Sequence, residues 1–406
     1  MSQELVNRSP DLKRLRDEGF AIEVAQAAYL VVRDVPYVNS SREVKLGILV
    51  SELSLANDVT TKPTTHVIFF SGEHPCHKDG TKIAQIVHQS ATQNLGGIEV
   101  HHSFSNKPWP DGYIDYYDKI DTYVRVISSP AQSINPNVTA KTFRVIETSE
   151  EESVFKYLDS ASSRAKIDQV TEKLKIRRLA IIGLGGTGSY VLDFVAKTPV
   201  KEIHLFDGDK YLQHNAFRSP GAPSGEELEQ QLSKVKYFKN IYSKMRRNIF
   251  AHPDHVDASN VDQLKEMDFV FICVDRGSAK KLIIEKLELW GISFIDVGMG
   301  IENVGTGLTG ILRTTTSTPQ YRRHVQKRVY FADDDPEGVY NQNIQIAELN
   351  AFNAAQAVIK WKKLLGFYHD LENEHNSTYS IDCNLLTSEE VIETPDLISD
   401  ETKLKA

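Results

Sequence analysis

Short apolar runs alternate with helix-like stretches in the second half of the chain. The run at 179–182 is followed directly by a glycine and the run at 203–206 by an aspartate. A third run, at 268–275, ends in an aspartate. Such runs are typical of buried parallel strands. Between the first two, residues 189–197 space their apolar side chains as one face of a helix. This order predicts an α/β fold with a doubly wound, mostly parallel sheet.

The first 150 residues carry a less regular pattern that still mixes helix and strand signals. Apolar positions predict helices over 10–33 and 81–90. Continuous or alternating apolar runs predict strands at 44–50, 66–70, 98–104 and 122–128. These segments favour a second, mixed α/β domain.

Residues 130–151 separate the two patterns. They contain prolines and many Ser, Asn, Thr and Glu residues, a composition typical of a connection. We therefore expect an N-terminal domain at 1–150, a Rossmann-like domain at 151–386 and a polar, acidic tail at 387–406.

A glycine-rich turn follows the first strand of the Rossmann-like domain. It contains Gly183, Gly185, Gly186 and Gly188, which would let the backbone approach a phosphate at the positive end of the next helix. Asp207 lies about 20 residues further on, where an NAD site places its ribose carboxylate. Taken alone, this spacing is compatible with an NAD-dependent oxidoreductase.

The residues after Asp207 favour a different ligand. Asp209, Asn215 and Arg218 follow within a short stretch, and an NAD site has no evident need for them. Carboxylates suit Mg²⁺ and ribose hydroxyls, and an arginine suits phosphate charge. This set therefore indicates a nucleoside triphosphate bound with a metal.

Five separated segments resemble the superfamily of ThiF, MoeB and the ubiquitin-activating (E1-like) enzymes. They are GLGGTG at 183–188, DGD at 207–209, NAFR at 215–218, Lys236 in SKVK and Asp275 in FVFICVD. The resemblance covers about residues 164–385. Two features depart from the family pattern: Arg218-Ser219 stands where Arg-Gln is usual, and the paired CxxC zinc motifs of many relatives are missing.

The resemblance implies an adenylation domain that uses ATP and Mg²⁺. It assigns Asp207 to the ribose, Asp209 and Asp275 to the metal, and the glycine turn to the phosphates. It further assigns Asn215, Arg218 and Lys236 to the triphosphate. Arg218, Lys236 and Asp275 would thus be the catalytic residues, and Arg164 would reach a nucleotide, often that of a partner subunit.

The reaction implied is adenylation of a protein C-terminal carboxylate, yielding an acyl-adenylate and pyrophosphate. The resemblance points to a ubiquitin-like or sulfur-carrier protein as the substrate and to a homodimer. The N-terminal domain would recognise that protein or a conjugating enzyme. A non-catalytic scaffold that binds nucleotide or carrier protein remains an alternative, as does the oxidoreductase.

Charge and cysteine usage exclude some other classes. The net charge of −8 argues against a nucleic-acid partner. No stretch reaches the about 18 apolar residues of a membrane span. Three scattered cysteines are too few for a disulfide framework, so we expect a cytoplasmic protein.

Histidines and a cysteine gather in the N-terminal domain, as His74, Cys76, His77, His101 and His102. They could form a metal site, activate a thiol, or be no more than a polar turn with strand-end histidines. Their spacing matches no zinc template, and adjacent strand residues point to opposite faces.

The cysteines also bear on a possible thioester. Cys76 would lie in an exposed turn, whereas Cys273 and Cys383 would lie in strands. We expect the enzyme to stop at the adenylate and pass the acyl group to a partner, with Cys76 as the alternative acceptor.

Overall fold

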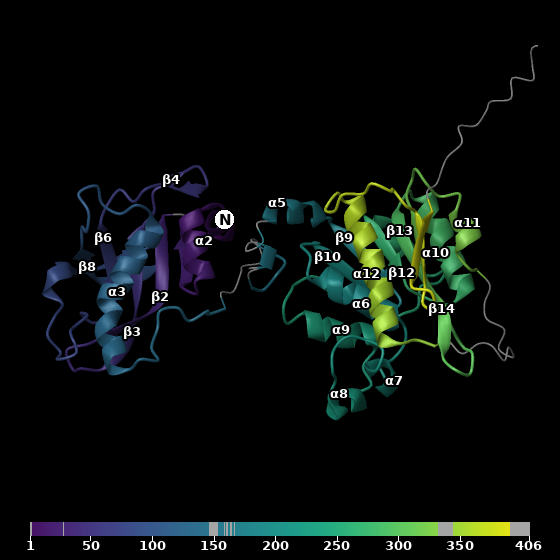
Figure 1. The fold of residues 1–406 in the computed structure, drawn as a ribbon, viewed down its shortest axis with the longest axis horizontal. Coiled ribbons are helices and arrows are strands. Elements are labelled where there is room, and N and C mark those ends of the chain that lie inside the picture. Colours follow the sequence, from purple (N-terminus) through teal and green to yellow (C-terminus); the bar gives the residue numbers. More distant parts are fainter. Residues whose placement is uncertain are drawn as a thin grey trace, which may run out of the picture. The chain divides into compact units, whose positions relative to one another are not determined.

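The protein forms two compact units, residues Met1–Ile167 and Asp168–Ala406 (Figure 1). The structure is a computed structural model, and it describes residues 2–26, 28–145, 153–157, 159, 161–162, 165, 167–331 and 344–389. Each unit has its own hydrophobic core. No helix in these ranges is long and apolar enough to cross a bilayer.

The N-terminal unit is an antiparallel sheet covered by helices, with strand order β1-β2-β3-β6-β8-β7. Its strands are β1 (Ala21–Ala25), β2 (Tyr29–Val38), β3 (Val44–Glu52), β6 (Val67–Ser71), β7 (Val87–Leu95) and β8 (Ile98–Ser105). A separate ribbon joins β4 (Leu55–Ala56) to β5 (Val59–Thr60). The helices are α1 (Ser2–Arg8), α2 (Pro10–Asp17), the short 3-10 helix η1 (Ala84–Ile86) and α3 (Tyr116–Ile134).

Three of the expected elements in this unit are wrong. The helix expected over 10–33 ends at Asp17 and is followed by β1 and β2, and the helix expected over 81–90 is η1 and the start of β7. The strand expected over 122–128 lies inside α3. There the buried residues Ile120, Tyr123, Val124 and Ile127 recur three and four positions apart, so their packing on one helix face outweighs the strand preference of branched side chains.

The C-terminal unit contains an eight-stranded sheet in the order β11-β10-β9-β12-β13-β14-β15-β16. The strands are β9 (Arg178–Ile182), β10 (Glu202–Phe206), β11 (Ile249–His252), β12 (Phe269–Ile272), β13 (Ser293–Asn303), β14 (Leu308–Ser317), β15 (Asn376–Ser380) and β16 (Leu385–Glu389). The first five in this order are parallel and the last three pair antiparallel. The doubly wound, mostly parallel fold is therefore confirmed.

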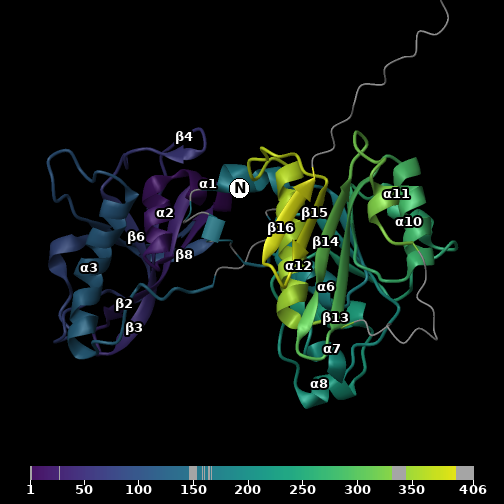
Figure 2. The same ribbon diagram turned by 45° about the vertical axis from the view of Figure 1, so that its right-hand side comes forward.

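Helices cover both faces of this sheet (Figure 2). Those with side chains in the larger core are α6 (Gly186–Ala196), α9 (Lys234–Tyr242) and α12 (Ala347–Leu364). The opposite face carries η3 (Val261–Glu266), α10 (Gly277–Leu289) and α11 (Val325–Arg328). The remaining short helices are α5 (Asp168–Thr171), η2 (Glu172–Leu174), α7 (Gln213–Ala216) and α8 (Gly225–Glu229).

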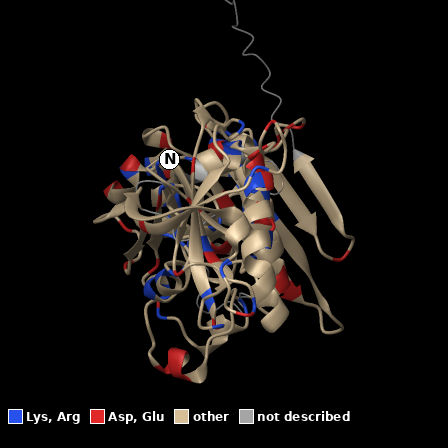
Figure 3. Ribbon diagram, turned by 90° about the vertical axis from the view of Figure 1, so that its left-hand side faces the viewer, with Lys and Arg blue, Asp and Glu red and all other residues tan. Residues whose placement is uncertain are grey.

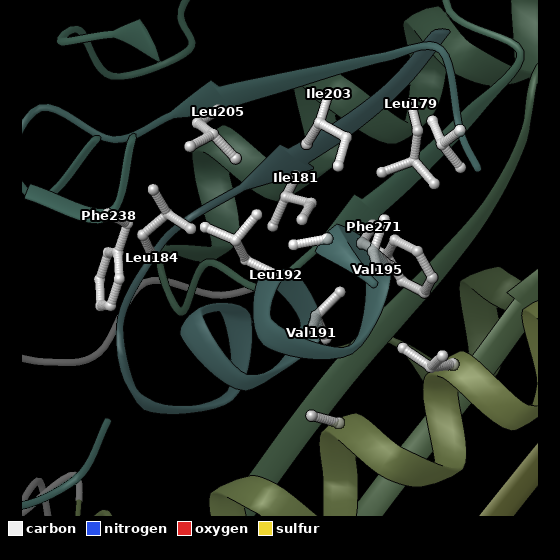
Figure 4. Packing of buried hydrophobic residues seen from close by; sticks show 14 of the residues in the cluster. Leu179, Ile181, Leu184, Val191, Leu192, Val195, Ile203, Leu205, Phe238 and Phe271 are labelled. Atoms are coloured by element: carbon white, nitrogen blue, oxygen red, sulfur yellow. The ribbon is translucent and has the colours of Figure 1, made fainter. Parts of the chain in front are cut away.

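The packing of α6 fixes the position of the glycine-rich turn. Val191, Leu192 and Val195 are fully buried and belong to the same core cluster as Leu179 and Ile181 of β9 (Figure 4). The crossover from β9 through α6 to β10 is thereby held on one face. Because β9 lies between β10 and β12, the chain changes direction here, and the carboxyl ends of strands at such a point are where open α/β sheets bind ligands.

Candidate nucleotide site

The glycine turn closes tightly around the carboxyl end of β9. Gly183 has φ +86°, and a Cβ there would lie 2.7 Å from the carbonyl oxygen of Cys273. A Cβ on Gly186 would overlap the side-chain amide of Asn350. Any other residue at these two positions would therefore push the turn away from its neighbours. The turn delivers the first N–H groups of α6 to the crevice.

Asp207 holds this turn to the end of β10. Its Oδ2 accepts a hydrogen bond of 2.7 Å from the backbone N–H of Leu184, and its Oδ1 accepts one of 2.9 Å from Asp209. The side chain is buried. The carboxylate assigned to the ribose by resemblance thus also has a structural task, because it joins the glycine turn to the loop after β10.

Asp209 is the centre of a charged cluster beside Asp207. The Nζ of Lys234 lies 2.7 Å from Oδ2 of Asp209 and 3.6 Å from Oδ1 of Asp207. His255 Nε2 lies 3.5 Å from the other oxygen of Asp209. Partial burial raises the pKa of Asp209, but the Lys234 hydrogen bond and the charges of Lys234, His255 and Arg276 outweigh it and hold that pKa below its ordinary value. Asp209 is therefore an anion at neutral pH.

The structure places Lys234, rather than Lys236, against these carboxylates. Lys234 is buried in the first turn of α9, whereas Lys236 is exposed. The resemblance assigns Lys236 to the triphosphate, not to these carboxylates, so that assignment stays a prediction. The chain breaks between α8 and α9, and within α9 Lys234 and Lys236, two residues apart, lie on nearly opposite sides of the helix.

Asn215 and Arg218 present buried donors that lack acceptors. The Oδ1 of Asn215 accepts a hydrogen bond of 2.8 Å from the N–H of Leu212, but its Nδ2 and the Nε of Arg218 find no partner among the described residues. Unpaired buried donors are costly. Ser219, which departs from the family pattern, is turned inward and bonds to Tyr211.

Asn350 connects three parts of the site and was missed by the sequence analysis. Its Oδ1 accepts a hydrogen bond of 3.0 Å from Thr187 of α6, and its Nδ2 donates one of 3.2 Å to the carbonyl oxygen of Arg218. The side chain is 1% exposed. The only signal in the sequence was a polar residue within the apolar stripe of a helix, which alone does not identify a partner.

The two remaining residues that the resemblance assigns to the site are Asp275 and Arg164. Asp275 is exposed in the short connection between β12 and α10, at the same edge of the sheet as Asp209. The neighbouring Arg276 acts electrostatically on Asp209, so the loops after β10 and β12 lie within reach of each other. Arg164 lies outside the described residues.

Sequence comparison assigns both halves of the chain. Residues 157–396 match the ThiF family, which is more than half of the chain. The chain therefore belongs to the ThiF family. Residues 10–160 match a family described as a domain of unknown function, DUF6791.

Solved structures of MccB and PaaA are similar to part of this chain. E. coli MccB with ATP is 18% identical, with a TM-score of 0.45, over 54% of this chain and 65% of that chain. The microcin C7 biosynthetic enzyme MccB in complex with N-formylated MccA is 17% identical, with a TM-score of 0.44, over 69% and 80%. PaaA is 16% identical, with a TM-score of 0.43, over 55% and 75%. The match to the ATP complex thus spans about two thirds of the MccB chain.

Outside the ThiF-family domain, the histidine and cysteine group does not form an exposed reactive turn. Cys76 is fully buried, its Sγ donates to the carbonyl oxygen of His74, and burial raises the pKa of its thiol. The rings of His74 and His102 lie 5.0 Å apart, while His101 accepts from the N–H of Gly72. No group of three or more His, Cys, Asp or Glu in the described ranges could hold a metal.

The other two cysteines lie within the ThiF-family domain. Cys273 packs beside the larger core, and burial raises the pKa of its thiol. Cys383 is exposed in the turn between β15 and β16, so the single strand expected around it is in fact a hairpin. Cys383, and not Cys76 as expected, therefore lies in an exposed turn.

Proposed function

We propose that the protein is an ATP-dependent adenylyltransferase that activates the C-terminal carboxylate of a ubiquitin-like or sulfur-carrier protein. The observation that carries this proposal is the pair of buried donors, Asn215 Nδ2 and Arg218 Nε, that lack acceptors in the described chain. Asn350 ties the backbone of Arg218 to α6, so these donors belong to the same site as the glycine turn. A polyphosphate supplies the acceptors that they need.

The arrangement also favours ATP over NAD. In an NAD site, the carboxylate after the second strand is the ribose ligand. Asp207 could bind a ribose of either a dinucleotide or ATP, so the residues beyond it decide between the two ligands. Arg218 brings a positive charge and, together with Asn215, buried donors without acceptors among the described residues, which suits a triphosphate better than a dinucleotide's pyrophosphate.

Mg²⁺ fits the carboxylates at this edge. Asp209 and Asp275 follow β10 and β12, both are exposed, and neither belongs to a closed cluster of metal ligands within the described residues. Magnesium is commonly held by one or two carboxylates together with substrate phosphates. When bound, the metal would neutralise phosphate charge.

The chain's own residues would act by alignment and charge stabilisation. The substrate carboxylate is an anion at neutral pH and needs no general base to attack the α-phosphate. The N–H groups of α6 would orient the phosphates, and Arg218 would stabilise the charge that develops on them. Lys234 would keep Asp207 and Asp209 in place.

We then expect the acyl group to be transferred to a partner protein. Cys76 and Cys273 are disfavoured as acceptors because burial raises the pKa of both thiols. We propose that the N-terminal domain recognises the carrier protein or a conjugating enzyme, and that the protein acts as a homodimer in which Arg164 reaches the nucleotide.

Pyrophosphate exchange into ATP tests the proposal. Purified protein is incubated with ATP, Mg²⁺ and labelled pyrophosphate, in the presence of each of a panel of ubiquitin-like and sulfur-carrier proteins. We expect exchange that depends on one carrier and on its free C-terminal carboxylate. Asp275→Ala should lower exchange by roughly 10²–10³-fold, a size typical of one charge-stabilising group. Binding of NAD without ATP binding or exchange would overturn the proposal, and ATP binding without exchange for any carrier would support the scaffold.

A further inference from the structure

A buried carboxylate on β13 is held by two cations that come from different elements. Asp296 is fully buried. The Nζ of Lys280, on α10, lies 2.9 Å from its Oδ1, and the guanidinium of Arg313, on β14, donates a hydrogen bond to its Oδ2. A buried charge without a partner is strongly destabilising. These three side chains form an ion cluster that joins α10 to the sheet.

Two members of this ion cluster belong to the sheet itself. Asp296 and Arg313 lie on the adjacent strands β13 and β14. Arg313 also donates hydrogen bonds of 2.7 Å to Thr315 Oγ1 and to the carbonyl oxygen of Arg328, at the end of α11. Asp296 would therefore keep a well-held partner if Lys280 were replaced. Lys280 is the member through which α10 takes part.

Lys280 supplies the buried side chain at the start of α10. The buried residues of this helix are Gly277, Lys280, Ile283, Ile284 and Leu287. The last three are apolar, so hydrophobic packing holds the later turns of the helix. In the earlier part, Gly277 has no side chain to pack, and Lys280 reaches Asp296. The ion pair of Lys280 therefore fixes the start of α10 against β13.

Lys280 acts at both ends of the connection that carries Asp275. This connection, residues 273–276, joins β12 to α10. At its start, the positive charge of Lys280 acts electrostatically on the thiol of Cys273. At its end, the backbone N–H of Lys280 donates a hydrogen bond of 3.1 Å to the carbonyl oxygen of Arg276. The position of Lys280 therefore determines where the connection presents Asp275.

We propose that Lys280 is a positioning residue for Asp275, and that its ion pair with Asp296 sets the placement of the Asp275 carboxylate toward Mg²⁺. The inference rests on the proposed function and adds a residue that supports its metal ligand. Lys280 is 5% exposed and its ammonium faces Asp296, so it acts through Asp275 and not on the substrate. Misplacement of a reacting or charge-stabilising group by about 1 Å can lower a rate on the order of 10²-fold.

Binding of ATP with and without metal tests this role by isothermal titration calorimetry of the full chain. Lys280→Met should bind ATP with Mg²⁺ roughly 10- to 100-fold more weakly, and should bind ATP in EDTA as the wild type does, because the effect passes through a metal ligand. Lys280→Arg keeps a cation that pairs with Asp296 and should restore most of the affinity. Lys281→Met, at the exposed neighbouring position, should bind like the wild type.

A double-mutant cycle separates positioning from general destabilisation. Lys280→Met alone should lower pyrophosphate exchange roughly 10- to 100-fold. In the Asp275→Ala protein, the same change should lower exchange by less than about twofold, because the group that Lys280 positions is gone. Equal losses in the two backgrounds, or a folded Lys280→Met protein with wild-type exchange and metal-dependent binding, would overturn the inference.

Hydrogen–deuterium exchange reads the same step without any ligand. The amides of residues 273–280 should exchange faster in Lys280→Met than in the wild type, with no change in α6. If Lys280→Met does not fold, Lys280→Met combined with Asp296→Asn, which leaves no buried carboxylate to pair, should give the same results. Unchanged exchange of this segment would overturn the inference by itself. A wild-type protein that does not bind ATP would instead overturn the proposed function.

Discussion

Lys234 shows how one side chain can organise a charged site. It is buried, and its Nζ lies within 4 Å of one oxygen each from Asp207 and Asp209. Two carboxylates close together repel each other unless a cation lies between them. The lysine therefore offsets the repulsion between the two carboxylates beside the glycine turn.

Replacing this lysine should damage the site, whereas replacing its neighbour should not. Lys234→Met leaves the two carboxylates without their cation, so we expect carrier-dependent pyrophosphate exchange to fall by about 10²-fold. Lys236→Met, at an exposed position, should change exchange by less than about twofold. Exchange rates of the two folded variants are compared with the wild type; a larger loss in Lys236→Met would restore the assignment made by resemblance.

The contrast between these lysines shows what the sequence could predict at the residue scale. The positions of the glycines and of Asp207 follow from the order of strand, turn and helix, because such local geometry is encoded by adjacent residues. Lys234 and Asn350 depend on where one helix breaks and on how α12 packs against α6, which are long-range properties. A single sequence does not specify them.

The cysteines give a second test at this scale. Carrier protein, ATP and enzyme are incubated and separated on a non-reducing gel. We expect no enzyme-linked adduct, because burial raises the pKa of the Cys76 thiol and the acyl group passes to a partner. A reductant-sensitive adduct that disappears in Cys76→Ala would contradict this account, and one that disappears in Cys383→Ala would identify the exposed hairpin thiol as the acceptor.

At the scale of elements, α3 carries an unusual buried charge in the core of the N-terminal domain. The Nζ of Lys119 donates 2.9 Å hydrogen bonds to Ser51 Oγ and to the carbonyl oxygen of Thr65. Burial lowers the pKa of Lys119 from 10.5 to about 8. The folded domain therefore releases this proton at a lower pH than the unfolded chain does.

This shift predicts how stability changes with pH. Below about pH 8 both states hold the proton; between about pH 8 and 10.5 the unfolded chain holds more protons, so the free energy of unfolding rises with pH. The slope contributed is at most about 1.4 kcal/mol per pH unit. The raised thiol pKa values of Cys76 and Cys273 act in the opposite direction in this window but are common to both proteins. Denaturant unfolding from about pH 8 to 9.5 should therefore give a slope that is more positive in the wild type than in Lys119→Met.

The matched control for this prediction is Lys78→Met, at an exposed position of the same domain. It should keep the pH profile of the wild type. An identical slope in Lys119→Met and the wild type would show that Lys119 does not cause the pH dependence.

The same helix illustrates where element prediction from sequence fails. The strands β9, β10 and β12 were predicted closely because their apolar runs are short and bounded by glycine or aspartate. In α3, the stretch at 122–128 contains branched and aromatic residues that fit a strand equally well. Packing against β2 decides in favour of the helix, and that contact is distant in sequence.

At the scale of the whole molecule, the two units carry separate cores and separate family matches. The DUF6791 match ends at residue 160 and the ThiF match begins at 157. Acidic and basic residues are interspersed along the helices rather than gathered in one segment (Figure 3).

Assembly is the prediction that belongs to this scale. We expect a homodimer formed through residues 164–385, in which Arg164 of one subunit reaches the nucleotide of the other. Light scattering at micromolar concentration should give the mass of two chains, and Arg164→Ala should lower exchange while leaving that mass unchanged. A fully active monomer would contradict this prediction.

The fate of the substrate's carboxylate oxygen tests the central claim most directly. The C-terminal carboxylate of the cognate carrier protein is labelled with heavy oxygen, the reaction is run with ATP and Mg²⁺, and the acyl group is released to an added thiol or amine. If the carboxylate attacks the α-phosphate, one labelled oxygen remains on AMP, and mass spectrometry will find labelled AMP with unlabelled pyrophosphate. Label in inorganic phosphate, with ADP as the other product, would show attack on the γ-phosphate and contradict adenylation.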